Sequence, residues 1–110
     1  MLLPAVAEYT TCTYTLPMRV TWDDAKARDN LIKHDVDFAD AAVALEDVNA
    51  LTVEDQDHAE QRFKTLCMDP GLNILLVVHT YRGSEEIRLI SARKANTRQR
   101  KRYAEGLANG

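Results

Sequence analysis

The sequence predicts an α+β domain in which helices pack on one face of an antiparallel sheet. Three observations lead to this fold class. Before residue 46, apolar side chains recur with the period of a helix in two segments. From residue 50 the period changes to two, which is typical of strands. A capped, basic segment near the C-terminus adds a last helix, so we expect about four to five strands, two N-terminal helices and a C-terminal helix.

The N-terminal part of this fold is a short strand followed by two helices. Arg19–Trp22 has the composition of a strand. Asp23 and Asp37 are each placed to cap a helix, because a carboxylate at this position accepts a hydrogen bond from a free backbone N–H. The helices are expected over Asp24–His34 and Phe38–Leu45, and the second has the i, i+3, i+4, i+7 apolar spacing of one buried face.

Four strand-like segments come next. The short sequences Asp-Pro-Gly at residues 69–71 and Arg-Gly-Ser at residues 82–84 are turn signals. They predict that the last three strands form an antiparallel meander. The expected strands are Ala50–Glu54, Arg62–Met68, Asn73–Tyr81 and Glu86–Arg93.

A chain of 110 residues, 45% of them hydrophobic, supports one core and one domain. We place this domain at residues 18–110, because Met18 opens a segment that resembles a natural start. Residues 1–17 carry one charge and are Thr/Tyr-rich, so they are an upstream start, a tag remnant or an added edge strand. No apolar run is long enough for a membrane span, and the start lacks a basic n-region. Cys12 and Cys67 fit no metal-ligand spacing, so a reduced cytoplasmic protein without metal or cofactor is expected.

Charge is distributed unevenly along the chain. The net charge is −3, but residues 1–81 carry six basic and fourteen acidic side chains, whereas residues 82–110 carry eight basic and three acidic ones. Asn96 and Gln99 have the spacing of a capping box, so much of the basic charge is on a helix that runs to about Leu107. Such an end either attracts phosphate or is a solvated helix face.

The segment Ile87–Tyr103 is the most informative for function. Strict alternation in its strand places Arg88 and Arg93 on opposite faces. Arg88 then shares its face with the apolar Ala92, and Arg93 shares its face with Leu89. A partly buried guanidinium needs an anion, and its planar, bidentate geometry suits a phosphate. The alternative is an ion pair with a carboxylate, for which the candidates are Asp23, Glu54 and Asp55.

A pattern over about residues 18–105 resembles a known family. Its opening signature is Trp22-Asp23, Lys26-Ala27, Asn30, Lys33-His34, Val36 and Phe38. It continues through Asp47, Asp55, Arg62, the strand Leu75–Thr80 with Arg82-Gly83, Ile87-Arg88, Ile90-Ser91-Ala92-Arg93 and Tyr103. In this order and spacing, these residues resemble the BrnT toxins.

The resemblance implies a fold similar to the RelE-type ribonucleases and a ribonuclease that stops translation. It also implies a co-encoded antitoxin, BrnA, which has a ribbon-helix-helix-like DNA-binding part and forms with the toxin a heterotetramer that represses its own operon. The chain departs from the family at Asp35, where glycine is usual, and in its N-terminal extension. Asp35 should be tolerated because Asp adopts left-handed backbone conformations more readily than most residues. The alternatives are a non-catalytic nucleic-acid- or antitoxin-binding module of the same fold, and direct DNA binding through the basic helix.

RNA cleavage without a metal uses the 2′-hydroxyl of the substrate as nucleophile, so the protein must help to move protons and stabilise the phosphate. Arginines serve as phosphate clamps, because a guanidinium pKa above about 12 prevents proton transfer. A histidine, the tyrosine or Lys64 would move protons. The expected catalytic residues are Arg62, His79, Arg88, Arg93 and Tyr103. The expected RNA-binding residues are Lys33, His34, Lys64, Lys94, Arg98 and Lys101.

Four of these residues also have structural interpretations. His34 can end the first helix and interact with its dipole. His79 can be a satisfied core residue, and Tyr103 can anchor the last helix to the sheet. Lys33 can pair with Asp29, four residues before it on the same helix.

Overall fold

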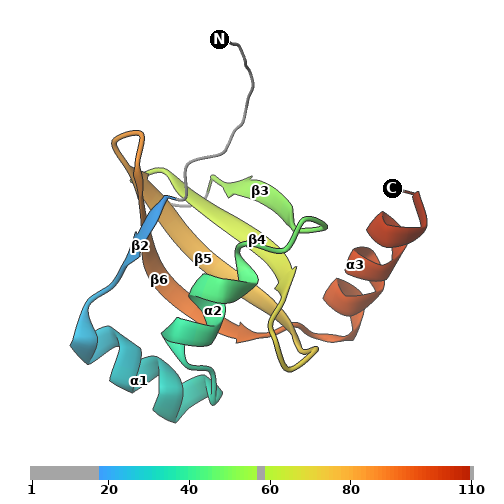
Figure 1. Cartoon of the computed structure of the whole chain (residues 1–110), viewed down its shortest axis with the longest axis horizontal. Coiled ribbons are helices and arrows are strands. Elements are labelled where there is room, and N and C mark those ends of the chain that lie inside the picture. Colours follow the sequence, from blue (N-terminus) through green and yellow to red (C-terminus); the bar gives the residue numbers. More distant parts are fainter. Residues whose placement is uncertain (1–17, 57–58, 110) are drawn as a thin grey trace, which may run out of the picture.

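The computed structural model describes residues 18–56 and 59–109, so the expected extension at residues 1–17 lies outside the described part. The two helices before the meander and the one after it confirm the predicted α+β class. None of the described helices is long and apolar enough to span a membrane. The elements are, in order, β2 (Arg19–Thr21), α1 (Asp24–His34), α2 (Phe38–Ala44), β3 (Leu51–Asp55), β4 (Arg62–Met68), β5 (Ile74–Arg82), β6 (Glu86–Lys94) and α3 (Thr97–Asn109) (Figure 1).

The five strands form one sheet in the order β2-β6-β5-β4-β3. Strands β3 to β6 are the antiparallel meander that the turn signals predict. The expectation of an antiparallel sheet fails at one edge, where β2 pairs with β6 in parallel, with Val20 opposite Ile87. The physical reason is that no hairpin joins these two strands. The chain leaves β2 through α1 and α2, enters the sheet at the far edge and returns to β6 in the direction of β2.

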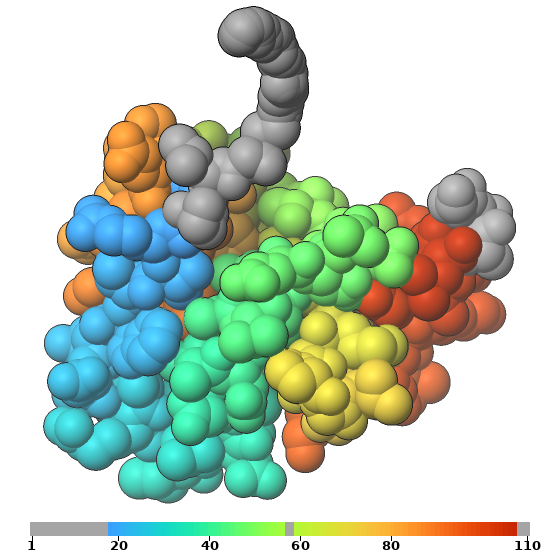
Figure 2. All heavy atoms as spheres, viewed as in Figure 1, coloured from blue at the N-terminus to red at the C-terminus, as the bar shows by residue number. Residues whose placement is uncertain are grey.

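We expected the helices to pack on one face of the sheet, but they cover both faces. On one face, Phe38 of α2 packs with Cys67, Leu75 and Val77 in the larger core. On the other face, α3 packs with residues that alternate with these along the strands; this smaller core is built from Leu66, Leu76, Ala95 and Tyr103. The space-filling view shows α1 and α2 over the front of the molecule and α3 set to one side (Figure 2).

Short-range signals fixed the helix ends as predicted. The side chains of Asp23 and Asp37 accept hydrogen bonds from the backbone N–H groups of Lys26 and Ala39, in the first turns of α1 and α2. Asn96 and Gln99 bond each other's backbone N–H at 2.8 and 3.0 Å, which is a capping box. Asp35 ends α1 in the left-handed conformation, with φ 56°, so the expectation that Asp is tolerated there is confirmed.

Candidate functional site

The position of α1 beside β6 depends on one buried polar side chain. Strand β2 pairs only with residues 86–88, so the remaining edge of β6 is open to α1. Asn30, 5% exposed, pairs with this edge as a strand would: its Nδ2 donates to the carbonyl of Ala92 at 2.8 Å, and its Oδ1 accepts from the N–H of Ala92 at 3.0 Å. A third hydrogen bond, to the carbonyl of Val36, holds the turn after α1. This amide therefore fixes α1 against the edge of the sheet.

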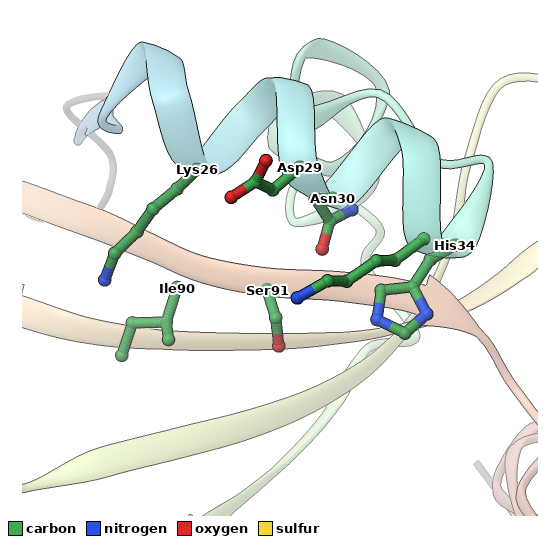
Figure 3. A pocket seen from close by; sticks show the side chains of 7 residues that line it. Lys26, Asp29, Asn30, His34, Ile90 and Ser91 are labelled. Atoms are coloured by element: carbon green, nitrogen blue, oxygen red, sulfur yellow. The ribbon is translucent and has the colours of Figure 1, made fainter.

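A hollow lies between α1 and β6 next to this amide. Ile90 and Ser91 of β6 form its floor, and the side chains of α1 reach over it (Figure 3). Lys26 and Lys33 are seven residues apart, which places them on one face of the helix. The α1 residues that line the hollow are Lys26, Asp29, Asn30, Lys33 and His34.

A second hollow continues the first along β6. It shares Lys26 and Ile90 with the first and adds the cationic side chains of Arg82 and Arg88. Asp23, Glu60, Thr80 and Leu89 complete its lining. We call the two hollows together the α1–β6 groove. Its cations are Lys26, Lys33, Arg82 and Arg88, with the titratable His34 at one end, and its carboxylates are Asp23, Asp29 and Glu60.

A bulge in β6 changes which side chains share a face. The pairing of β5 with β6 shifts by one residue at Val78/His79, so that Ile90 is the extra residue of β6. Leu89 and Ala92 are therefore both buried in the larger core, contrary to strict alternation. Arg88 and Arg93 consequently lie on the same face of the sheet, whereas we expected them on opposite faces.

Two further basic residues lie on the same side of the sheet as these arginines. Arg88 and Arg93 are opposite Thr80 and Leu76 of β5, and Lys64 of β4 is opposite Val78 between them. Arg62, two residues before Lys64, shares its side. We call this side, with Arg62, Lys64, Arg88 and Arg93, the arginine face.

Arg88 and Arg93 are half-buried and hold no carboxylate in the described part of the chain. Arg88 donates only a long hydrogen bond, of 3.4 Å, to the hydroxyl of Thr21. Arg93 donates to Gln99 Oε1 at 3.2 Å and to the carbonyl of Lys94 at 3.3 Å. The carboxylates expected as their partners interact with other groups. Asp23 caps α1, Glu54 accepts a hydrogen bond from Gln61, and Asp55 pairs with Lys64. Both guanidinium groups thus retain donors for an external anion.

Arg62 and Lys64 already have anionic partners. Arg62 pairs with Glu60 at 3.0 Å, and Lys64 lies 3.8 Å from Asp55. The Glu60 side chain is 59% exposed, so this pair exchanges readily with an incoming phosphate. Asp55 is buried at 8% exposure, which makes Lys64 the less available cation.

His79 lies in the core and is shielded from solvent. It is 1% exposed, and its Nε2 is 2.8 Å from the hydroxyl of Thr65. Its Nδ1 has no hydrogen-bond partner among the described residues. Burial lowers its pKa from the ordinary value of 6.5 to about 4. This placement fits the structural interpretation of a core histidine and not that of a proton carrier.

Tyr103 is buried too, at 3% exposure, and anchors α3. Its hydroxyl donates to Asp47 Oδ2, which also accepts from the N–H of Met68. Burial and this hydrogen bond raise the pKa of Tyr103 to about 12. Burial alone would raise the pKa of Asp47, but hydrogen bonds from Tyr103 and from the N–H groups of Asn49 and Met68 outweigh it, so the pKa is lowered. A tyrosine held in this way supports the fold, as its structural interpretation predicts.

The other expected RNA-binding residues are exposed but dispersed. Lys94 is opposite Leu75, on the face of the sheet away from the arginines. Arg98 and Lys101 are exposed on α3. None of the three lines the groove. Among the residues that the structure describes, no group of three or more His, Cys, Asp or Glu is placed to hold a metal ion.

Two cations of the groove, Lys26 and Arg82, belong to the family pattern but were not among the expected site residues. For Lys26 a signal was available, because its seven-residue spacing from Lys33 places both on one helix face. Arg82 ends β5 opposite Glu86, and the pairing of β5 with β6 brings it to the hollow that Arg88 lines.

Comparison with known proteins identifies relatives of this chain. The model of a family described as "Ribonuclease toxin, BrnT, of type II toxin-antitoxin system" matches residues 22–99. Among solved structures, the chain is similar to the Brucella abortus ribonuclease toxin BrnT, with 30% sequence identity and a TM-score of 0.56. The similarity covers 73% of this chain and 99% of that one. The search of curated proteins gives no match.

Proposed function

This chain belongs to the BrnT family of ribonuclease toxins of type II toxin–antitoxin systems, and we propose that its RNA substrate lies along the α1–β6 groove and the adjoining arginine face. Membership confirms the resemblance on which the sequence argument rested. The protein is accordingly a ribonuclease toxin, and a protein antitoxin is its partner.

The observation that carries the proposal is the position of Arg88. It lines the groove, lies on the arginine face and has no ion-pair partner among the described residues. A guanidinium binds two phosphate oxygens at once and remains charged at every physiological pH. We assign Arg88 to the scissile phosphate, with Lys26 and Arg82 beside it. Arg93, farther along the same strand, would bind a neighbouring phosphate.

The groove also contains a group that can transfer protons. His34 is exposed, lines the first hollow and is on the same helix face as the groove lysines (Figure 3). An imidazole titrates near neutral pH, which suits a general acid or base. Of the groups expected to move protons, a histidine, the tyrosine or Lys64, we assign this role to His34. Lys33, Arg62 and Lys64 would hold the RNA backbone beside the scissile bond, whereas Lys94, Arg98 and Lys101 would add only long-range attraction.

The cationic groove also suits the antitoxin. We propose that a BrnA-type antitoxin lays an acidic segment over Arg88 and Lys26 and so excludes RNA, since both ligands need the same charges. The toxin and antitoxin would form a heterotetramer in the cytoplasm and bind operator DNA through the antitoxin. Without the antitoxin, RNA cleavage would inhibit translation.

The test is cleavage of a labelled RNA by purified protein and by variants matched in charge. Lys26→Ala and Arg88→Ala each remove a groove cation, whereas Arg28→Ala removes an exposed cation of α1 that lines neither hollow. We expect the groove variants to lose most activity, with melting temperatures near that of the wild type, and Arg28→Ala to retain it. Equal activity in all three, or a large drop in melting temperature for Arg88→Ala, would contradict the assignment.

A further inference from the structure

One carboxylate of the α1–β6 groove, that of Asp29, has no partner in the described part of the chain. The other two have evident roles. Asp23 accepts a hydrogen bond from the N–H of Lys26 at 3.0 Å and caps α1. Glu60 pairs with Arg62 at 3.0 Å. The expected pair of Asp29 with Lys33 is not formed, although both line the same hollow.

The position of Asp29 places its carboxylate where RNA would lie. It projects from α1 above Ile90 and Ser91, on the side of the helix that also carries Lys26 and His34 (Figure 3). An exposed carboxylate at this position repels a phosphodiester backbone. It therefore weakens RNA binding, and a role in the chemistry would account for its presence there.

We propose that Asp29 is a catalytic residue that accepts the proton of the attacking 2′-hydroxyl, an inference that rests on the proposed function of the groove. The groove cations cannot take this role, since a guanidinium and an ammonium are already protonated. His34 alone cannot supply both a base and an acid in one step. A carboxylate and an imidazolium in one hollow provide the two proton-transfer groups that cleavage requires.

The step is an internal transesterification that consumes no other reactant. Asp29 takes the 2′-hydroxyl proton while the 2′-oxygen forms a bond to phosphorus. The bond from phosphorus to the 5′-oxygen breaks, and the imidazolium of His34 gives that oxygen its proton. The products are a 2′,3′-cyclic phosphate and a 5′-hydroxyl. Proton exchange with water then restores the carboxylate and the imidazolium, while Arg88 stabilises the charge on the phosphoryl oxygens.

The experiment compares Asp29→Asn with Asp24→Asn in the purified full chain. Both substitutions remove one negative charge from α1, but Asp24 lines neither hollow. Binding is measured with an oligonucleotide that carries a 2′-deoxy sugar at the cleavage site and cannot be cut. We expect Asp29→Asn to bind this probe at least as tightly as the wild type and to cleave RNA at least about 100-fold more slowly. Asp24→Asn should cleave at the wild-type rate, and Asp29→Glu should recover part of the lost rate.

The outcomes separate this inference from the proposed function. If Lys26→Ala and Arg88→Ala lose activity but Asp29→Asn cleaves as fast as Asp24→Asn, the role of Asp29 is overturned and the groove stands. If the Lys26 and Arg88 variants cleave like the wild type, the groove itself is wrong. A melting temperature for Asp29→Asn near that of Asp24→Asn shows that any lost rate is not a loss of fold. A loss of probe binding by Asp29→Asn would also overturn the inference, because it would make Asp29 a binding group.

Discussion

Acid should destabilise this protein through the buried histidine of β5. His79 has one hydrogen-bond partner, Thr65, whose hydroxyl is in turn 2.8 Å from that of Thr52. Phe63 and Tyr81 pack around the ring. A charged ring carries a proton on both nitrogens, and its Nδ1–H would be a buried donor without an acceptor among the described residues. The folded protein therefore keeps His79 neutral.

The size of this effect follows from the pKa of His79 in the two states. Burial lowers the pKa from 6.5 to about 4, so the unfolded chain binds the proton more tightly. The stability that neutral His79 allows is fully present above pH 6.5 and is lost as the pH falls towards 4. At pH 5 the unfolded histidine is mostly protonated and the folded one mostly neutral, which costs about 2 kcal/mol relative to pH 7. Below pH 4 the loss levels off at about 3 kcal/mol.

Urea unfolding of the wild type, His79→Gln and His34→Gln between pH 7 and pH 5 measures this loss. His79→Gln removes the titrating ring but retains an N–H that can donate to Thr65. Its stability at pH 7 can be lower, but its fall towards pH 5 should be smaller than that of the wild type by about 2 kcal/mol. His34→Gln should follow the wild type, because His34 is exposed. Parallel curves for the wild type and His79→Gln would refute the reasoning, and His79→Phe is a second variant if glutamine prevents folding.

Three further predictions concern the supports of the fold and the groove. Tyr103→Phe leaves Asp47 without its hydroxyl donor and should lower the free energy of unfolding by about 1–3 kcal/mol, measured in urea; an unchanged midpoint would show that the hydrogen bond contributes nothing. Asn30→Ala leaves the N–H and carbonyl of Ala92 without their side-chain partner and should lower the free energy of unfolding by about 1–3 kcal/mol. It should also slow RNA cleavage, although no groove cation changes. Full activity would show that the site does not depend on the position of α1. Leu72 is 76% exposed and has a left-handed backbone conformation, with φ 67°, which glycine adopts without strain. Leu72→Gly should therefore raise the free energy of unfolding by about 1 kcal/mol and the melting temperature with it. A lower melting temperature would contradict this prediction.

Local signals were sufficient to predict most elements of this fold. Side-chain caps such as those of Asp23 and Asn96 depend on residues within three positions, and the structure forms both. The left-handed backbone at Asp35 was expected for the same reason, because it depends on one residue type. The pairing of β2 with β6 joins residues that are more than sixty positions apart, and no short-range pattern carries its direction.

The site residues were harder to predict, because burial decides what a titratable group can do. The sequence pattern around a histidine in a strand of alternating apolar residues is the same whether that face of the strand contacts solvent or a helix. His79 and Tyr103 lie in the two cores, and their pKa values move away from neutrality in opposite directions. Lys26 and His34 are ordinary residues of an amphipathic helix in the sequence. They line one groove because α1 lies against the open edge of β6, where Asn30 holds it.

The bulge in β6 explains how a chain of net charge −3 can present a cationic surface. Two arginines five positions apart on a regular strand would face opposite ways, with one of them directed into the larger core. The extra residue, Ile90, absorbs one position, so both arginines face away from that core. Ile90 itself becomes the floor that the two hollows share. Since Glu60 and Asp55 are held by Arg62 and Lys64, the field that a phosphate meets near Arg88 is set by this local arrangement and not by the charge of the whole chain.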